Sequence, residues 1–583
     1  MDDPKERQDV SGEESRDSSE NTVNSKDKSD EDGVNSKAQS EENAGSSEDR
    51  AEDHRERSNS TGDQKRVKRI GLAALILAFG ILCSRLLGLL RESVIAYQAG
   101  AGADTDAYNA AFLIPDIMNH FLAGGTLSIT FIPLFAGYMA QNEPKKAERL
   151  FSMIATTLGT FVTIAIILCG IFTTPLVQLA FPGFDASQVA RTVEMTRIIL
   201  PGQFFHMLGA LMLGVLMAKG HFVPSAIAPS IYNLCIIACG VALGGTMGMK
   251  GFAIGALVGA FLGPFLLPLL FVRKKIQFKP EFGFFDPDFK KYVLLTLPLL
   301  IGVSLTTVDE WLGRCLGSTL GTAAISWLSY ARKLVLVPIG LIGQAAGQAA
   351  LPYLSQLSAR KEYDKVAETL HRVLKNVILL AMIVMGFFIV LAEPVVSLLY
   401  ERGAFTSQDT ATTAMVLRIL TLSIVFWTIQ MVSVRAFYAD KSMLRPMALT
   451  TIVTILSIPI YVQMSRWYGI EGFAYASCIG MALQATGMVI FYHRKNAIFK
   501  PYKLLKPIAI GLMLGGLAGA GSYAGLWLFG KLSLDLPLML NNLVALTIAG
   551  GLGLVLVGLM ARFIIPDEFR GFTSKLRKKI LRR

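Results

Sequence analysis

The 583-residue chain has few charged residues and lacks a nucleotide-binding signature. Only 17% of its residues are charged, against 52% that are hydrophobic, and its mean hydropathy is +0.47. This balance excludes an ordinary soluble protein and is typical of a membrane protein. The sequence has no Gly-x-x-x-x-Gly-Lys-Ser/Thr loop, so it offers no phosphate-binding loop of its own for ATP. Energy for any transport must therefore come from a gradient or from a partner.

The cysteines are few and form no metal-binding or redox pattern. All six lie in apolar stretches, none belongs to a Cys-x-x-Cys pair, and no histidine lies nearby at metal-ligand spacing. We therefore expect packing roles for them and predict neither a metal site nor a cofactor. The six are Cys83, Cys169, Cys235, Cys239, Cys315 and Cys478.

Acidic residues are scarce in most of the chain and are concentrated at its start. Residues 1–63 hold 20 Asp and Glu against 9 Lys and Arg, a net charge of −11, so the remainder carries a net charge of +23. The segment 1–66 also nearly lacks aromatics, so it cannot bury enough apolar surface to offset the entropy of ordering. We predict a disordered, solubilising cytoplasmic tail there, and a basic cytoplasmic tail at 564–583.

Long apolar runs fill the region between the two tails. A helix that crosses a bilayer needs roughly 20 largely apolar residues, and about fourteen such runs lie between residues 70 and 563. Lys and Arg gather in alternate breaks between these runs, such as Lys145/Lys146 and Lys274/Lys275, as they do on the cytoplasmic side of membrane proteins. This alternation predicts that both termini face the cytoplasm.

Two halves of this region resemble each other. PLVQLAFPGFDASQ from Pro175 resembles PVVSLLYERGAFTSQ from Pro394, and GMKGFA from Gly248 matches GIEGFA from Gly469. The offset of about 220 residues covers six spans, so the copies share one orientation and are related by an axis along the membrane normal. We predict an all-α polytopic membrane protein. Its parts are an N-lobe at 70–275, a cytoplasmic linker at 276–289, a C-lobe at 290–494 and two further helices at 504–563.

Ionisable residues lie deep in the first predicted span, where their cost of several kcal/mol makes a functional role the default explanation. Arg85 lies about fifteen residues, or roughly 22 Å, into the span, too deep to extend to the cytoplasmic surface. Arg91 and Glu92 follow near the far end, and Arg91 has the alternative of extending to the outer interface. Arg85 and Glu92 fall on nearly the same helix face, with Arg91 roughly 100° away from Glu92.

The second span combines polar side chains with helix-breaking residues. Asp106 lies at its outer start, and Asn119 follows between Pro115 and the glycine pair at Gly124. These residues predict a discontinuous helix that lines a cavity. Asp106 has two alternatives, either pairing with Arg91 to close an outer gate or capping its own helix.

The second lobe has a comparable set of charges. Glu310 and Arg314 are spaced i,i+4 in the favourable order, which is typical of a self-neutralised pair, and Asp309 has no obvious local partner. Arg332 and Lys333 lie near the middle of the eighth span and point roughly 100° apart, so we expect one to face the cavity and the other a neighbouring helix. Together the deep charges predict a cavity that is positive overall and suits phosphate or pyrophosphate.

At these residues the chain resembles the MurJ-type lipid II flippases of the multidrug/oligosaccharidyl-lipid/polysaccharide exporter superfamily. The resemblance rests on SRLLGLLRE from Ser84, GAGADTDAYNAAFLIPDIM from Gly100, TFIP from Thr130 and RAFYADKSMLRP from Arg435, and it covers essentially all of 70–563. It implies a transporter of the bacterial inner membrane, not an enzyme. It also implies outward movement of the undecaprenyl-pyrophosphate-linked peptidoglycan precursor by alternating access, and it assigns Arg85, Arg91, Lys333 and Asp106 to the central cavity and its gate.

The chain also departs from the family pattern. Asn119 stands where the family usually has Arg, Gly124 and Gly125 replace a Glu-Gly pair, and Leu336 stands where an acid is common. The span at 444–465 offers mainly Thr and Ser where some members use carboxylate or amide groups for sodium. The driving force is therefore left between the membrane potential and a monovalent cation.

These arguments define two sets of candidate residues and the expected partners. The substrate-binding set is Arg85, Arg91, Asn119, Arg332 and Lys333, and the gate or ion-coupling set is Glu92, Asp106, Asp309, Glu310 and Arg314. The expected partners are an anionic lipid-linked glycan and membrane lipids, with the cell-wall synthesis machinery as a further candidate and no nucleic acid. The alternatives are a flippase for another polyprenyl-linked glycan, a cation-coupled drug exporter, a membrane glycosyltransferase or a scaffold. The short outer loops, without clustered acids or histidines, argue against a glycosyltransferase.

Overall fold

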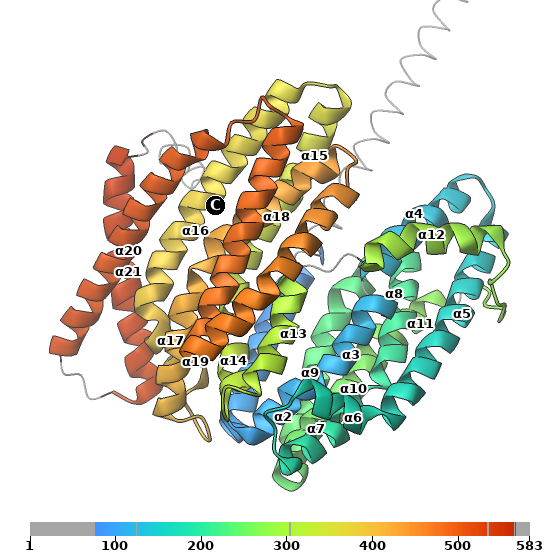
Figure 1. Cartoon of the computed structure of the whole chain (residues 1–583), viewed down its shortest axis with the longest axis horizontal. Helices are drawn as coiled ribbons and strands as arrows, with labels where there is room; N and C mark the ends of the chain where they lie inside the picture. Colours follow the sequence, from blue (N-terminus) through green and yellow to red (C-terminus); the bar gives the residue numbers. More distant parts are fainter. Residues whose placement is uncertain are drawn as a thin grey trace, which may run out of the picture. The chain divides into compact units, whose positions relative to one another are not determined.

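The structure, a computed structural model, describes residues 76–564 and 566, except 78, 124, 274, 302–304 and 533–535. The predicted tail at 1–66 and nearly all of the tail at 564–583 lie outside the described residues. Every regular element in the described part of the chain is helical, which confirms the all-α prediction (Figure 1).

The first lobe begins with a helix over residues 79–99. The second predicted span follows in four pieces: α2 (Ala103–Ala111), α3 (Leu113–Met118), the π-helical segment η1 (Asn119–Ala123) and α4 (Gly125–Ala140). The rest of the lobe comprises α5 (Pro144–Ile171), α6 (Thr173–Ala180), α7 (Ala186–Ile199), α8 (Gly202–Ala218), α9 (Val223–Met247), α10 (Met249–Ala260), the π-helical η2 (Phe261–Leu266) and α11 (Leu267–Val272).

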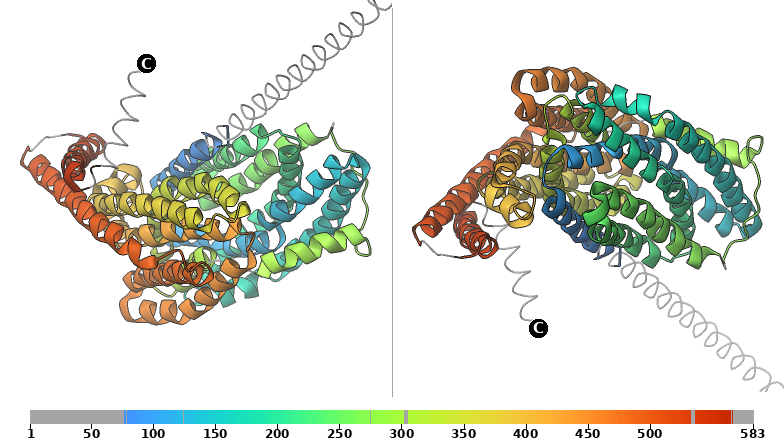
Figure 2. Two further views of the ribbon diagram at one scale, coloured as in Figure 1. Left: turned by 90° about the horizontal axis from the view of Figure 1, so that it is seen from above. Right: turned by 90° about the horizontal axis from the view of Figure 1, so that it is seen from below.

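The second lobe follows the same plan. It comprises α12 (Pro287–Ile301), α13 (Leu305–Gly317), α14 (Ala324–Ile339), the π-helical η3 (Gly340–Gln344), α15 (Ala345–Ala359), α16 (Tyr363–Tyr400), α17 (Ser407–Thr421), α18 (Ser423–Ala439) and α19 (Leu444–Lys495). A short 3₁₀ segment η4 (Pro501–Leu504) then leads into α20 (Leu505–Lys531) and α21 (Leu538–Ile564). These last two helices pack on α16, and both views of Figure 2 place them on the side of the molecule opposite α5.

Nine of the described helical segments are long and apolar enough to cross a bilayer, or ten if the bent pair α17–α18 counts as one span. This number is consistent with the expected fourteen spans, although that count stays a prediction. The single helix α19 contains two of the predicted spans, joined at Gly469. Three further predicted spans are not among these nine because they contain charged residues or breaks. They correspond to the helix over 79–99, to α2–α4 and to α12–α13.

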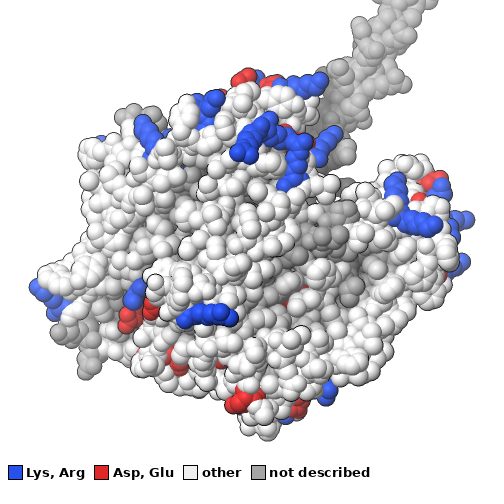
Figure 3. All heavy atoms as spheres, viewed as in Figure 1, with Lys and Arg blue, Asp and Glu red and all other residues white. Residues whose placement is uncertain are grey.

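The surface of the described helices is suited to lipid. Figure 3 shows a broad band of uncharged surface between two edges at which charged side chains gather. Large apolar side chains are exposed on many helices, among them Leu86, Ile167, Leu294, Leu456 and Leu554. An apolar surface of this extent would be unfavourable in water, whereas a bilayer covers it with hydrocarbon.

The backbone conformation repeats between the two lobes. Gly248 has φ 57° and ψ −136°, and Gly469 has φ 58° and ψ −135°. The segments η1 and η3 begin 221 residues apart. Three further pairs of residues with positive φ are separated by 219 to 221 residues, namely Gly100 and Gly321, Asn142 and Lys361, and Gly220 and Lys441. This agreement supports the repeat inferred from the sequence motifs.

The motif that first revealed the repeat has a local structural role in each copy. Asp185 caps α7, and its side chain accepts a hydrogen bond from the backbone of Gln188. Thr406 caps α17 in the same way, with Asp409 in the place of the glutamine. In both cases the third residue of the helix returns a bond to the cap, which makes two capping boxes. The two lobes therefore start corresponding helices by the same means.

We predict that Gly469→Ala lowers the free energy of unfolding by about 1–3 kcal/mol because its φ and ψ are accessible essentially only to glycine. An added Cβ would meet no atom within 4 Å, so backbone strain alone causes the loss. Gly245→Ala is the matched control, since Gly245 has equally open surroundings but lies within α9. That change should be neutral or stabilising by up to about 1 kcal/mol. Thermal unfolding of the purified protein measures both, and equal effects would contradict the argument.

Candidate substrate cavity

A cavity of about 530 Å³ lies where elements of the two lobes meet. The first lobe contributes Asp116, Asn119 and His120 to its lining, and the second contributes Glu310, Arg332 and Trp427. A smaller cavity of about 90 Å³ shares Glu310 and Arg332 with it and is also lined by Arg314 and Lys333. Of the predicted substrate-binding residues, Asn119, Arg332 and Lys333 therefore line these cavities.

The breaks in the second span bring its polar residues to the cavity. Its helix is interrupted at Phe112 and changes to π-helical geometry at Asn119, shortly after Pro115. Such π-helical segments often occur at functional sites because they alter the direction of the side chains they carry. His120 also packs edge-on against Trp311 of the facing lobe, with 5.6 Å between the ring centroids. The predicted discontinuous helix is thus present and borders the cavity.

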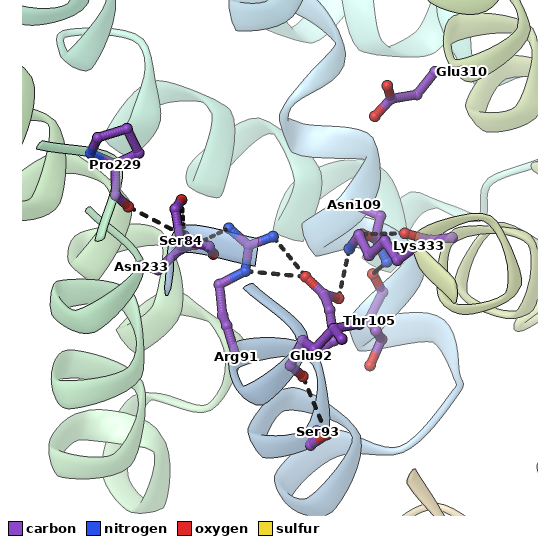
Figure 4. Close-up of polar contacts among 12 residues, drawn as sticks. Ser84, Arg91, Glu92, Ser93, Thr105, Asn109, Pro229, Asn233, Glu310 and Lys333 are labelled. Carbon is purple, nitrogen blue, oxygen red and sulfur yellow. Dashed lines mark hydrogen bonds and ion pairs between the residues drawn. The ribbon is translucent and has the colours of Figure 1, made fainter. Parts of the chain in front are cut away.

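Glu92 is the centre of a buried charge cluster that joins the lobes. Its carboxylate is 2.6 Å from the guanidinium of Arg91, which precedes it in the first helix, and 2.5 Å from the ammonium of Lys333 in α14. Arg91 also donates to the side-chain oxygen of Asn233 in α9 at 3.0 Å. Figure 4 shows Arg91 between Glu92 and Asn233, with Lys333 on the other side of Glu92. Two cations share one carboxylate here, so the cluster has a formal charge of +1.

Arg85 reaches the second lobe without meeting a carboxylate. It donates to the backbone carbonyl of Leu336 at 3.1 Å and to the side-chain oxygen of Gln344 at 2.7 Å. No carboxylate of the described residues forms an ion pair with it. Gly340 makes room for this side chain, because a Cβ there would lie 1.6 Å from an Arg85 nitrogen. Arg85 and Glu92 both contact the α14–η3 segment, as expected from their common helix face.

The other deep charges in the second lobe are paired with acids. Arg314 contacts Asp116 and Glu310, each at 2.7 Å, so this group has a formal charge of −1. The i,i+4 pair predicted from the sequence therefore forms, and it gains a third member from the first lobe.

Asp309, which had no obvious partner in the sequence, pairs with Arg332. Their side chains approach to 2.5 Å, and the Asp309 carboxylate also accepts a hydrogen bond from the Tyr461 hydroxyl at 2.5 Å. Asp309 is only 2% exposed. Arg332 therefore stays within its own lobe, whereas the adjacent Lys333 crosses to the other.

The prediction of a cavity that is positive overall needs correction. The deep groups comprise five bases and five acids, so their formal charges cancel. What the structure shows instead is a separation of charge. A surplus of two positive charges lies at Arg85 and the Glu92 cluster, and a surplus of one negative charge lies at the Arg314 group. The sequence could not reveal this separation of charge, because it does not specify which acid each base contacts.

Asp106 adopts neither of the two roles considered from the sequence. Its buried carboxylate accepts hydrogen bonds from the backbone nitrogens of Ala323 and Ser326, at 2.7 and 2.8 Å, and from the Ser326 hydroxyl at 2.5 Å. It therefore caps α14 of the opposite lobe instead of its own helix α2 or Arg91. The N-cap residue of α14 is Ala323, which has no side-chain acceptor, so the free N–H groups of that helix need one from elsewhere.

Further contacts close the lobes together near Asp106, at the predicted outer end. The Tyr330 hydroxyl donates to the carbonyl of Gly100 at 3.0 Å, and the backbone nitrogen of Ala404 donates to the carbonyl of Tyr97 at 2.9 Å. Ile325 of α14 packs in one apolar cluster with residues of α2, α3 and α7. The structure is therefore closed between the lobes at this end.

Several residues of the site were not singled out from the sequence. Asn233 holds Arg91, Gln344 holds Arg85, and Tyr461 holds Asp309. Asn233 and Gln344 are amides within apolar spans, which was an available signal. Tyr461 was not recognisable, because a lone tyrosine in a span is common. Trp427, whose side chain lines the cavity, was not recognisable either, because only the packing of α18 brings it there.

Comparisons with known proteins agree with this architecture. The family described as lipid II flippase MurJ matches residues 95–534. The probable lipid II flippase MurJ of Bdellovibrio bacteriovorus is 28% identical over 468 residues, covering 79% of this chain and 88% of the relative. The corresponding protein of Vibrio cholerae is 28% identical over 510 residues, covering 84% of this chain and 96% of the relative.

Solved structures support the fold. A lipid II flippase MurJ in an inward closed conformation superposes with a TM-score of 0.70 at 23% identity, covering 84% of this chain and all of that one. An inward-facing multidrug resistance transporter of the MATE family superposes with a TM-score of 0.61 at 16% identity, covering 74% and 99%.

We predict that Asp106→Ala lowers the free energy of unfolding by about 1–3 kcal/mol because it leaves buried N–H groups of α14 without an acceptor. Asp104→Ala is the control in the same helix, since Asp104 is exposed and pairs with Arg191 within one lobe. That change should cost about 0–1 kcal/mol. Thermal unfolding in detergent compares the two. The contact between Asp106 and α14 would be unimportant if both variants unfolded alike.

Proposed function

The chain belongs to the MurJ lipid II flippase family, and from this membership we propose how it moves lipid II, the undecaprenyl-pyrophosphate-linked peptidoglycan precursor, across the bacterial inner membrane. The observation that carries the proposal is the surplus of positive charge at Arg85 and the Glu92 cluster, at the junction of the two lobes. A diphosphate is the part of the substrate that such a surplus recognises.

Arg85 is the residue best placed to exchange its partners for a phosphate. Its present acceptors, a carbonyl and an amide oxygen, are neutral. A phosphate oxygen carries negative charge, so it attracts the guanidinium more strongly than a neutral carbonyl or amide oxygen does and would compete well for Arg85. When no substrate is bound, Gln344 and the Leu336 carbonyl hold the Arg85 side chain in place.

Lys333 and Arg91 form the second half of the proposed headgroup site. Both cations contact the single carboxylate of Glu92, which is 3% exposed. A phosphate that binds Lys333 neutralises the surplus charge of this cluster. Because Lys333 and Glu92 belong to different lobes, binding would also weaken an interlobe ion pair, which links recognition of the headgroup to movement of the lobes.

We place the Asp106 end of the lobes at the outer face of the membrane and both termini in the cytoplasm. The alternation of basic breaks supports this orientation. In the closed-outside state the headgroup enters from the cytoplasmic side through a gap between the lobes, while the polyprenyl chain stays in lipid. Rocking of the lobes then separates Asp106 from α14 and exposes the headgroup outside.

The membrane potential is the proposed driving force. An inside-negative potential contributes about 2.3 kcal/mol per charge per 100 mV. It favours outward movement of the anionic headgroup and inward return of the empty site with its surplus cations. A coupled monovalent cation is a second candidate, favoured by the two carboxylates of Asp116 and Glu310 that share Arg314.

We expect Arg85→Ala to abolish complementation of a bacterial strain depleted of its own lipid II flippase, because loss of a charge-assisted contact of about 1.5–3 kcal/mol weakens headgroup binding roughly 10- to 150-fold. Arg85→Lys should retain partial activity, since it keeps the charge without the planar donors. Arg197→Ala is the control, because Arg197 bonds a carbonyl of its own lobe away from the cavity. Accumulation of a different lipid intermediate on depletion would assign another polyprenyl-linked glycan.

The driving force is testable in vesicles that contain the purified protein and lipid II. An imposed potassium-diffusion potential, negative on the side from which lipid II leaves, should accelerate its movement several-fold because the headgroup carries net negative charge. Accessibility of the headgroup to an added enzyme on the receiving side measures the rate. A rate that is unchanged by the potential but rises with a sodium gradient would favour the cation instead.

A further inference from the structure

A second large cavity lies within the first lobe, apart from the site at the lobe junction. It has a volume of about 700 Å³ and lies between α5, α8 and α11. This volume is in the range of about 300–1,000 Å³ that is typical of ligand sites. Its lining includes Phe151, Gly159, Leu208, Phe265 and Leu269 and shares no residue with the two cavities at the lobe junction.

Three threonine hydroxyls in the wall of this cavity, called the groove below, already form hydrogen bonds with the backbone. The Thr160 hydroxyl donates to the carbonyl of Thr156 at 2.8 Å, and the Thr163 hydroxyl donates to the carbonyl of Gly159 at 2.7 Å. The Thr156 hydroxyl accepts from the backbone nitrogen of Glu281 at 3.3 Å. A hydroxyl that is bonded to the backbone needs no hydrogen bond from a ligand, so the groove is suited to an apolar occupant.

The segment that joins the lobes forms one wall of the groove. It runs from Lys275 to Asp286 without forming a helix and lies along α5, where Figure 1 shows it as a light-green loop. The hydroxyls of Ser152, Thr156 and Thr157 accept hydrogen bonds from three of its backbone nitrogens, at 3.0 to 3.3 Å.

An ion pair also holds this segment. Arg149 of α5 contacts Glu281 at 2.6 Å and Asp286 at 3.2 Å. The wall is therefore attached to α5 along most of its length.

This segment exposes aromatic side chains at the level of the membrane helices. Phe285 is 90% exposed, and Phe278, Phe282 and Phe284 are about half exposed. The ring of Phe284 lies 6.3 Å from that of Phe161, itself an exposed residue well inside the apolar part of α5. Exposed phenylalanines beside a lipid-facing helix are stable in hydrocarbon and unfavourable in water. Contact with the hydrocarbon of a bilayer would therefore stabilise this segment more than exposure to water would.

A cation stands at one end of the groove. Arg273 follows the last residue of α11, lines the groove and is exposed, and none of the described residues forms an ion pair or side-chain hydrogen bond with it. The wall of the groove extends along α5 from Phe151 to Ile164, which is about 20 Å of helix. One leaflet of a bilayer contributes about half of a hydrocarbon core of about 30 Å. The groove is therefore long enough to hold one lipid chain, and Arg273 at its end would then meet the headgroup.

We propose that this groove binds one acyl chain of an anionic phospholipid of the cytoplasmic leaflet, with the lipid phosphate at Arg273 and the phenylalanines of residues 278–285 in the same leaflet. Basic sites between membrane helices on the cytoplasmic side bind anionic headgroups in this way. The proposed occupant is a bulk lipid and not the chain of the transported substrate, because the groove is separate from the lobe junction where we place the diphosphate.

The test uses the full-length protein in phosphatidylcholine vesicles that contain a trace of phosphatidylglycerol with a photoactivatable acyl chain. Mass spectrometry locates the adducts after illumination. We expect adducts on α5 between Phe151 and Ile164. Arg273→Ala should reduce them roughly five-fold, the effect of one base near an anionic surface.

Two further variants make the test specific. Arg494→Ala is the matched control, because Arg494 is the exposed arginine 221 residues later, at the end of the corresponding span of the second lobe. It should leave the adducts on α5 unchanged. Thr160→Trp places a large ring in the groove and should reduce the adducts while Arg273 is intact. Each variant must elute from size exclusion as the wild type does.

Three results would overturn the proposal. The first is equal labelling of α5 by photoactivatable phosphatidylcholine, which would mean that the groove holds any neighbouring lipid. The second is an equal effect of Arg273→Ala and Arg494→Ala. The third is labelling of the groove by a photoactivatable undecaprenyl phosphate but not by phosphatidylglycerol, which would assign it to the substrate chain. None of these outcomes depends on whether the protein moves lipid II.

Discussion

The need to give every deep cation a partner governs this structure. The membrane interior cannot solvate a guanidinium or an ammonium group, so each one must meet a carboxylate, a carbonyl or an amide. Glu92 meets this need for Arg91 and Lys333 at once, and in doing so it connects the first helix to α14 of the other lobe. The sharing of one acid by two bases leaves a positive charge over, which an anionic headgroup can neutralise. The same contact therefore joins the lobes and, in the proposed function, prepares the site for the headgroup.

The two lobes repeat their backbone but not their chemistry. The π-helical segments of the two lobes correspond in position, yet η1 contributes Asn119 and His120 to the cavity lining, while η3 provides the space at Gly340 and the Gln344 side chain that receive Arg85. Duplication thus supplies a pair of similar scaffolds with a common boundary. At that boundary the side chains of the two lobes differ, so positive and negative charge lie at different places. A symmetric arrangement of side chains would not separate the charges in this way.

The closure between the lobes and the proposed recognition of the headgroup lie at different positions along α14. Asp106 holds the first turn of this helix through its N–H groups, whereas Lys333, about two and a half turns later, holds Glu92. A displacement of α14 relative to the first helix and α2 would break both contacts together, since α14 moves as a rigid element. Headgroup binding at Lys333, as proposed above, would therefore affect the distant cap at Ala323 without any change inside the helix itself.

The sequence by itself determined the all-α class, the duplicated halves, the broken second span and the identity of the deep ionisable residues. Each of these follows from local signals, such as apolar length, capping motifs and glycine or proline positions, that do not depend on distant parts of the chain. Only the tertiary structure decided the partners: that Asp106 caps α14, that Asp309 meets Arg332, and that Arg85 meets no described carboxylate. A buried charge needs a counter-group, but helix packing decides which group that is. The partners lie up to about 260 positions apart, so their spacing in the sequence does not identify them.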